Sequence, residues 1–293
     1  MALGTQLARR PIAVIDSGVG GLSVWREIAA LLPSESTIYL ADQAHLPYGP
    51  RPIEEIRGYV IAIAAALLGL QAKLIVVACN TASGAALTTL RETFPDVPFV
   101  GMEPAVKPAV ERTRSGVVGV LATPTTFQGD LFRRLADRFG EDVAIHTQTC
   151  PGLVEAVEAG AAHSVQTESL LRGCLTPLLE RGVDQLVLGC THYPFASDLI
   201  SKVAGPAVDI IDPAPAVARQ VQRVLTRMGM LTPEHDPTTH TFVTSGSPSL
   251  FTDQLHSLTG LDVPAQSAIW GDSSLRIGCI LLKENEDDRS GLG

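Results

Sequence analysis

Two copies of one short pattern constrain this chain more than any other feature. Residues 74–82 read Leu-Ile-Val-Val-Ala-Cys-Asn-Thr-Ala, and residues 186–194 read Leu-Val-Leu-Gly-Cys-Thr-His-Tyr-Pro. Each copy is an apolar run of strand length that ends at a cysteine and is followed by polar residues. Such a run is typical of a buried parallel strand, and open α/β sheets bind ligands at the carboxyl ends of these strands. We therefore expect Cys79 and Cys190 to face a ligand cleft.

The spacing of these patterns predicts two related halves. The two cysteines lie 111 residues apart, and the strand ends at Asp16-Ser17 and Ala122-Thr123 lie 106 residues apart. Predicted strands and helices alternate along the whole chain, which indicates an α/β fold with mostly parallel sheets. We expect two pseudo-symmetric three-layer halves with the active site in the cleft between them.

The same pattern gives domain boundaries. The first α/β domain is expected to span residues 1–102, to contain Cys79 and to be completed by residues 213–268. The second is expected to span residues 103–212 and to contain Cys190. The charged segment 269–293 is expected to be largely disordered, because its apolar pattern weakens.

Composition excludes several classes of protein. The net charge of −9 and the pI near 5.2 argue against nucleic acid as the main partner. The longest apolar run, residues 60–70, is shorter than the roughly 20 residues that a membrane span needs. No secretory signal is evident, so we expect a cytoplasmic protein with no membrane partner.

The five cysteines include no CxxC pair, so the sequence indicates neither a zinc site nor a disulfide framework. Free thiols suit the reducing cytoplasm. Cys150, Cys174 and Cys279 are interpreted as ordinary structural residues.

The first strand runs into a glycine-rich turn, Asp16-Ser-Gly-Val-Gly-Gly. A phosphate cradle is one interpretation, but the turn lacks the GxGxxG spacing and the Walker lysine. A compact strand-to-helix loop is the favoured alternative. Asp16 ends the strand and should face the cleft, unless it only caps the turn.

A cysteine between a strand and a helix can be reactive. The unpaired N–H groups at the helix start stabilise a thiolate, and with Asn80, Thr81 and Thr191 they can bind a carboxylate. A single cysteine in this position is more often a small buried hydrophobe, but two equivalent ones favour catalysis. His192 can serve one thiol as a proton partner. Glu155 and Glu158 lie three residues apart on one helix face, where such pairs are usually solvated.

Five ordered motifs together resemble the glutamate racemases. They are Asp16-Ser-Gly-Val-Gly-Gly-Leu, Pro47-Tyr-Gly, Ala78-Cys-Asn-Thr-Ala, Glu103-Pro-Ala-Val-Lys-Pro-Ala and Gly189-Cys-Thr-His-Tyr-Pro. The resemblance spans residues 11–245. Cys-Asn-Thr or Cys-Thr-His alone would indicate only the wider aspartate/glutamate racemase superfamily.

The resemblance implies interconversion of L- and D-glutamate without cofactor or metal, which supplies D-glutamate for peptidoglycan. Cys79 matches the thiol that deprotonates D-glutamate, and Cys190 matches the thiol that deprotonates L-glutamate. Asp16 and His192 match residues that assist the two thiols. A helical glutamate is also implicated, and the spacing to the next glycine favours Glu158 over Glu155 without deciding between them. The implied substrate-binding residues are Asp16, Ser17, Tyr48, Gly49, Asn80, Thr81, Thr191 and His192.

Two alternatives stay open. An aspartate or hydantoin racemase would share the fold and the thiols, and a substrate panel separates these activities. A non-catalytic binder of acidic amino acids would retain binding without the cysteines. A homodimer is expected from the family by analogy only.

Overall fold

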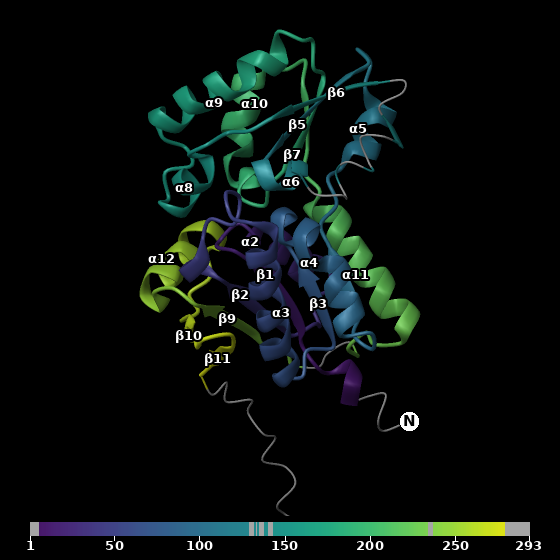
Figure 1. Ribbon diagram of the computed structural model, residues 1–293, viewed down its shortest axis with the longest axis vertical. Helices are drawn as coiled ribbons and strands as arrows, with labels where there is room; N and C mark the ends of the chain where they lie inside the picture. Colours follow the sequence, from purple (N-terminus) through teal and green to yellow (C-terminus); the bar gives the residue numbers. More distant parts are fainter. Residues whose placement is uncertain are drawn as a thin grey trace, which may run out of the picture.

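The computed structural model describes residues 6–128, 132, 134, 138–139, 143–233 and 237–278. Within these ranges the chain forms two sheets, of seven and four strands (Figure 1). The strands of the larger sheet are β1 (Ile12–Asp16), β2 (Thr37–Ala41), β3 (Leu74–Val77), β4 (Phe99–Gly101), β9 (His240–Thr244), β10 (Gln266–Trp270) and β11 (Leu275–Ile277). The strands of the smaller sheet are β5 (Val117–Ala122), β6 (Ala144–Gln148), β7 (Gln185–Gly189) and β8 (Asp209–Ile211).

Helices cover both sheets. Those packed on the larger sheet are α2 (Leu22–Leu31), α3 (Ile53–Gly69), α4 (Asn80–Thr93), α11 (Ala214–Met228) and α12 (Pro248–Thr259). The helices that accompany the smaller sheet are α5 (Val106–Arg112), α6 (Pro124–Gln128), α8 (Leu153–Glu158), α9 (Val165–Leu179) and α10 (Ser197–Ala204). Of these, α5, α9 and α10 contact its strands, and α8 packs on α9. Two 3₁₀ turns, η1 (Gln43–His45) and η2 (Tyr193–Ala196), follow strands β2 and β7. We call the two assemblies the large lobe and the small lobe.

The apolar strands have this composition because both faces of each sheet are buried. In β1, Ile12 and Val14 pack in the core that contains α2 and α11, whereas Ala13 and Ile15 pack in the core that contains α3 and α4. Successive side chains of a strand point to opposite faces, so a strand between two helical layers must be apolar throughout. This requirement explains why residues 74–77 and 186–188 are uninterrupted hydrophobic runs.

The two sheets repeat one topology. The larger sheet contains the order β2-β1-β3-β4, and the smaller sheet has the order β6-β5-β7-β8. Strand β1 therefore corresponds to β5, and β3 corresponds to β7. The strand pairs in both sheets are parallel apart from β10 with β11, which is antiparallel. The predicted fold class, two related α/β halves with mostly parallel sheets, is confirmed.

The prediction for the end of the chain is wrong in part. Residues 266–277 form β10 and β11, which extend the large sheet beyond β9. Leu275 is buried there, and the indole Nε1 of Trp270 donates to Asp42 Oδ1 at 2.8 Å. These strands are short, and long-range pairing stabilises them more than a local pattern does. Residues 279–293 lie outside the described part of the chain.

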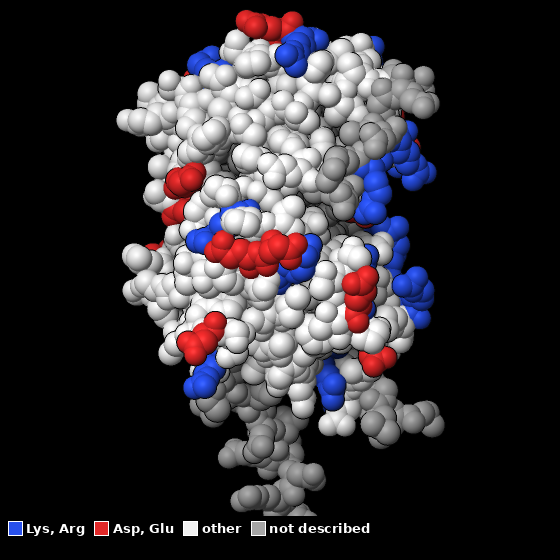
Figure 2. Space-filling model, viewed as in Figure 1, with Lys and Arg blue, Asp and Glu red and all other residues white. Residues whose placement is uncertain are grey.

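Charge is distributed unevenly over the surface. Figure 2 shows Lys and Arg gathered along the edge of the molecule where α5 and α11 lie. Helix α5 carries Lys107 and Arg112, and α11 carries Arg219, Arg223 and Arg227. The net charge of −9 therefore does not describe this edge. No helix in the described ranges is long and apolar enough to cross a membrane.

Candidate active site

A cavity of about 200 Å³ lies where the two lobes meet. Its walls come from the segments that follow β1, β2 and β3 in the large lobe and β5, β6 and β7 in the small lobe. The carboxyl ends of these parallel strands all point toward the junction. In both sheets the strand order reverses beside the first strand of the repeat, and ligands of open α/β sheets bind at such points. The lining residues that the sequence singled out are Ser17, Tyr48, Gly49, Cys79, Asn80, Thr81, Cys190, Thr191 and His192.

Cys79 caps a helix. It follows β3 and is the N-cap residue of α4, and its Sγ accepts a hydrogen bond from the Ala82 N–H at 3.5 Å. Burial raises the pKa of this thiol far above its ordinary value, and the nearby Asp16 carboxylate raises it further. The expectation that the helix start favours a thiolate is therefore wrong for Cys79, because burial outweighs the N–H groups of Thr81 and Ala82, which lower the pKa.

Cys190 has a different partner. Its Sγ lies 3.8 Å from His192 Nδ1, and His192 Nε2 lies 2.7 Å from Glu158 Oε1. Burial alone would lower the pKa of His192, but its hydrogen bonds to Cys190 and Glu158 hold that pKa well above the ordinary value. Burial also opposes ionisation of Glu158, yet the hydrogen bond to His192 leaves the pKa of Glu158 below its ordinary value. A charged imidazolium–carboxylate pair thus stands behind Cys190.

Glu158 is the helical glutamate that reaches His192. Its side chain is 10% exposed, whereas Glu155 is an exposed residue at the cavity wall. Neither helix periodicity nor charge distinguished the two residues, since they lie on one face of α8. The packing of α8 beside η2 brings Glu158, and not Glu155, within hydrogen-bond distance of His192.

Asp16 is fully buried behind the cavity and is absent from its lining. One carboxylate oxygen accepts the Gly18 N–H at 2.9 Å, and the other accepts the Thr191 hydroxyl at 2.9 Å. Burial raises the pKa of Asp16 despite the opposing charge of His192. Asp16 therefore forms an Asx turn with Gly18, as the alternative interpretation predicted. Its second carboxylate oxygen connects the large lobe to Thr191 of the small lobe.

The glycine-rich turn makes room for the small lobe. A Cβ on Gly18 would lie 2.0 Å from Glu158 Oε1, and a Cβ on Gly20 would lie 2.3 Å from His192 Nδ1. The Val19 N–H donates to Glu158 Oε1 at 2.8 Å. The turn therefore binds a carboxylate of the protein itself. This contact leaves little support for the phosphate-cradle interpretation, and it explains the glycines by close approach.

Asn80 is ready to bind a ligand. It is 4% exposed, lines the cavity, and neither its amide nitrogen nor its amide oxygen has a hydrogen-bond partner among the described residues. Buried polar groups almost always have partners, so this unpaired amide in a cavity is available to hydrogen-bond a bound molecule. Thr81 lies beside it, and its hydroxyl is 2.9 Å from that of Thr123 in the small lobe.

Sequence reasoning missed several wall residues. They come from the small lobe and are Ala122, Thr123, Pro124, Thr149, Cys150, Pro151, Gly152, Val154 and Tyr193. Thr123 follows β5 exactly as Ser17 follows β1, so the repeat itself was the signal that could have identified it. The buried carboxylate of Asp42 was also missed, and it accepts the Tyr48 hydroxyl at 2.6 Å.

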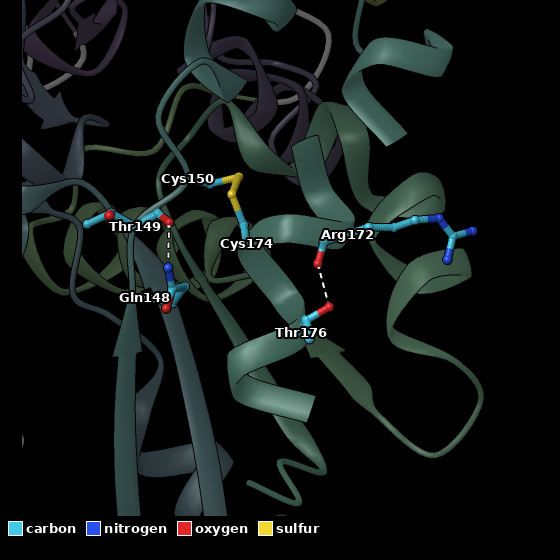
Figure 3. Close-up of a disulfide and its surroundings, with 6 residues drawn as sticks. All are labelled: Gln148, Thr149, Cys150, Arg172, Cys174 and Thr176. Atoms are coloured by element: carbon cyan, nitrogen blue, oxygen red, sulfur yellow. Dashed lines mark hydrogen bonds between the residues drawn. A yellow bond between two sulfur atoms is a disulfide. The ribbon is translucent and has the colours of Figure 1, made fainter. Parts of the chain in front are cut away.

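Two cysteines that were interpreted as ordinary structural residues form a disulfide. Cys150 follows β6 at the cavity wall, and Cys174 lies on α9, with Cα atoms 5.5 Å apart (Figure 3). The expectation of no disulfide is therefore wrong, because the tertiary packing of α9 brings together residues that are 24 positions apart. Cys79 and Cys190 are free thiols, and Cys279 lies outside the described residues. The described residues include no cluster of three or more His, Cys, Asp or Glu that could hold a metal ion.

Comparison with known proteins identifies the family. The model of the Asp/Glu/hydantoin racemase family matches residues 12–221. A glutamate racemase from Roseiflexus sp. is 51% identical over 250 residues, which cover 85% of this chain and 92% of that protein.

Solved structures agree with this match. A glutamate racemase structure from Bacillus anthracis has a TM-score of 0.81 at 33% identity, covering 90% of this chain and 98% of that one. The Escherichia coli glutamate racemase, solved with L-glutamate and the activator UDP-MurNAc-Ala, has a TM-score of 0.76 at 33% identity, covering 88% and 97%. The chain therefore belongs to the Asp/Glu/hydantoin racemase family, and within that family to the glutamate racemases.

Proposed function

We propose that Cys79 and Cys190 interconvert L- and D-glutamate by transferring protons on opposite faces of the α-carbon. The observation that carries the proposal is that two buried thiols occupy equivalent positions in the two lobes and line one cavity. The Bacillus anthracis and Escherichia coli relatives are glutamate racemases, and the latter binds L-glutamate, which supports glutamate as the substrate.

In the L-to-D direction, Cys190 is the base. A thiolate at this position is stabilised by the His192 imidazolium, which Glu158 keeps charged. The thiolate takes the α-proton of L-glutamate, and the C–H electron pair stays on the α-carbon as a carbanion. The protonated Cys79 thiol then donates its proton to the opposite face, which gives D-glutamate. The reverse reaction exchanges the two roles.

The α-proton of an amino acid is very weakly acidic, so the site must stabilise the developing negative charge. We assign Asn80, Thr81 and Thr191 to the α-carboxylate, because the Asn80 amide is buried and unpaired and the other two lie beside the thiols. Ser17, Tyr48 and Gly49 line the same cavity and are assigned to substrate binding. Asp16 is assigned to the Cys79 side, and it acts from behind the wall rather than by contact with substrate.

The cellular role follows from the product. We propose that the enzyme works in the cytoplasm and supplies D-glutamate for peptidoglycan synthesis. A homodimer is proposed on the family resemblance alone, and sedimentation equilibrium tests it. Two domains are proposed to move as units. One consists of residues 1–102 with 213–277, which extends the expected boundary at 268 to include β10 and β11, and the other consists of residues 103–212.

The test is circular dichroism of L- and D-glutamate solutions incubated with wild type, Cys79→Ser and Cys190→Ser, with no cofactor added. We expect both optical signals to decay to zero with wild type and to persist with each variant. Unchanged racemisation by either variant would overturn the two-thiol mechanism. Turnover of aspartate or a hydantoin in place of glutamate would move the substrate while leaving the mechanism intact.

A further inference from the structure

Glu158 belongs to the small lobe, but most of its hydrogen-bond partners belong to the large lobe. Besides His192, its carboxylate accepts from Val19 N–H at 2.8 Å, Gln43 Nε2 at 3.1 Å and Gln254 Nε2 at 3.3 Å. Gln254 Nε2 also donates to the Glu158 backbone carbonyl at 2.7 Å. Figure 1 shows the reason, because α8 lies against the end of the large lobe that carries α12.

Gln43 and Gln254 form an oriented pair, which we call the amide pair. Gln43 Nε2 donates to Gln254 Oε1 at 2.8 Å, and Gln43 Oε1 accepts the Thr244 hydroxyl at 2.8 Å. Thr244 is fully buried, and its oxygen accepts the Gly246 N–H at 2.9 Å. Since this chain of donors fixes the Gln43 oxygen toward Thr244, the Gln43 nitrogen must point to Glu158. Large-lobe residues thus orient Gln43, and Gln254 is held between Gln43 and Glu158.

This arrangement is more than a surface contact. Glu158 is 10% exposed and His192 is 3% exposed, and the glycine-rich turn leaves no space on their other side. The charged or titratable groups around His192 are Glu158, Asp16 and the Cys190 thiol. Of these, Glu158 forms the short hydrogen bond to Nε2, so its position determines how the imidazole is held against Cys190.

We propose that Gln43 and Gln254 are positioning residues for catalysis, which hold Glu158 against His192 across the junction of the two lobes. The proposal rests on the proposed function, in which His192 serves Cys190. It makes proton transfer at Cys190 depend on contact between α8 and the large lobe. The carboxylate beside Cys79 is that of Asp16, which belongs to the same lobe as Cys79, although it also accepts the Thr191 hydroxyl from the small lobe. Gln254 lies outside the residues 12–221 that match the family model.

The experiment compares Gln254→Ala, Glu158→Gln and the double variant with wild type. Gln166→Ala, at an exposed position of α9, is the matched control. We expect Gln254→Ala to lower kcat about threefold to tenfold with a smaller change in KM. The primary isotope effect with α-deuterated L-glutamate should rise more than that with α-deuterated D-glutamate. The double variant should be no slower than Glu158→Gln, because both changes act through one carboxylate.

A second readout is independent of turnover. The pKa of His192, followed by NMR of the imidazole, should fall in Gln254→Ala and stay unchanged in Gln166→Ala. The proposal would be overturned if Gln254→Ala had wild-type kinetics. It would also be overturned if the fold loss of kcat in the double variant equalled the product of the two single-variant losses. If instead Cys190→Ser retained full activity, the proposed function would fail first. The two failures are therefore distinguishable.

Discussion

Cys79 and Cys190 end equivalent strands, yet their surroundings differ. Cys79 lies at the start of the 14-residue helix α4 and beside the buried Asp16, and burial keeps it protonated. Cys190 precedes a short 3₁₀ turn and has an imidazolium–carboxylate pair behind it. The topological repeat thus places the two thiols, and residues that differ between its two copies, such as Asp16 and His192, give each thiol its own surroundings. In the proposed mechanism, this difference makes Cys190 the base for L-glutamate and Cys79 the acid.

The largest expected effect tests whether Cys190 deprotonates L-glutamate and Cys79 deprotonates D-glutamate, as this comparison implies. Cys79→Ser and Cys190→Ser should each slow racemisation on the order of 10³-fold or more, since each removes an essential acid–base group. In D₂O, any remaining α-proton exchange followed by NMR should be confined to D-glutamate in Cys190→Ser and to L-glutamate in Cys79→Ser. The opposite pattern would reverse the assignment of the thiols to the enantiomers.

Replacing His192 should slow mainly the proton transfer at Cys190. His192→Asn removes the imidazolium beside Cys190, and kcat should fall about 10²-fold. The enantiomers have equal free energy, so kcat/KM must fall equally in both directions. The isotope effect identifies the affected thiol. It should rise with α-deuterated L-glutamate, because Cys190 is the proposed base for that enantiomer. Asp16→Asn is the matched variant, and a rise with L-glutamate there as well would remove the proposed asymmetry.

Glu158→Gln should shift a pH dependence. Loss of the carboxylate lowers the pKa of His192, so the alkaline limb of the kcat profile should move to lower pH, with about a tenfold loss of activity near neutrality. The pair also contributes to stability. The raised pKa of His192 means that its contribution is complete below pH 6.5 and is lost as pH rises through the folded-state pKa.

The lowered pKa of Glu158 means that its contribution is present above about pH 4.5 and is lost as pH falls through its folded-state pKa. Urea unfolding of wild type and Glu158→Gln at several pH values checks this sign. The unfolding free energies of wild type and Glu158→Gln should differ most between the folded-state pKa of Glu158 and that of His192. A difference that grew steadily toward high pH would contradict this prediction.

The disulfide distinguishes the small lobe in another way. Cys174→Ser should lower the unfolding free energy by about 3 kcal/mol, because the bond closes a loop of 24 residues. The kcat should change by less than about threefold, since Cys174 is not in the cavity lining and the proposed catalytic thiols are Cys79 and Cys190. Urea unfolding with and without dithiothreitol measures this effect. Dithiothreitol should destabilise wild type and leave Cys174→Ser unchanged, and equal stability of both proteins without reductant would refute it.

The smallest expected effect concerns the end of the large sheet. Trp270→Phe removes the indole donor to Asp42, which also accepts the Tyr48 hydroxyl. We expect a loss of about 1 kcal/mol in unfolding free energy, the usual net value of one hydrogen bond. The KM for glutamate should rise slightly, because Tyr48 lines the cavity. Ile269→Ala, at an exposed position beside it, is the control, and an equal loss there would argue against the hydrogen bond.

Much of the fold could be predicted because its signals are local. The apolar runs at residues 74–77 and 186–188 identify buried strands, and the residues after them identify the ligand edge. Glu158 could not be separated from Glu155 in this way, because both lie on one helix face and only the packing of α8 beside η2 selects one. Strands β10 and β11 were missed for a similar reason, since each is short and depends on pairing with distant strands.

The sequence by itself determined that two cysteines end two buried parallel strands, because strand burial and its termination are encoded by neighbouring residues. Only the tertiary structure decided which groups surround each thiol. Asp16 and Thr191, Glu158 and Gln254, and Cys150 and Cys174 are partners that come from separate elements. Hydrogen bonds and disulfides depend on positions to within a fraction of an ångström, and those positions are set by how the lobes and helices pack.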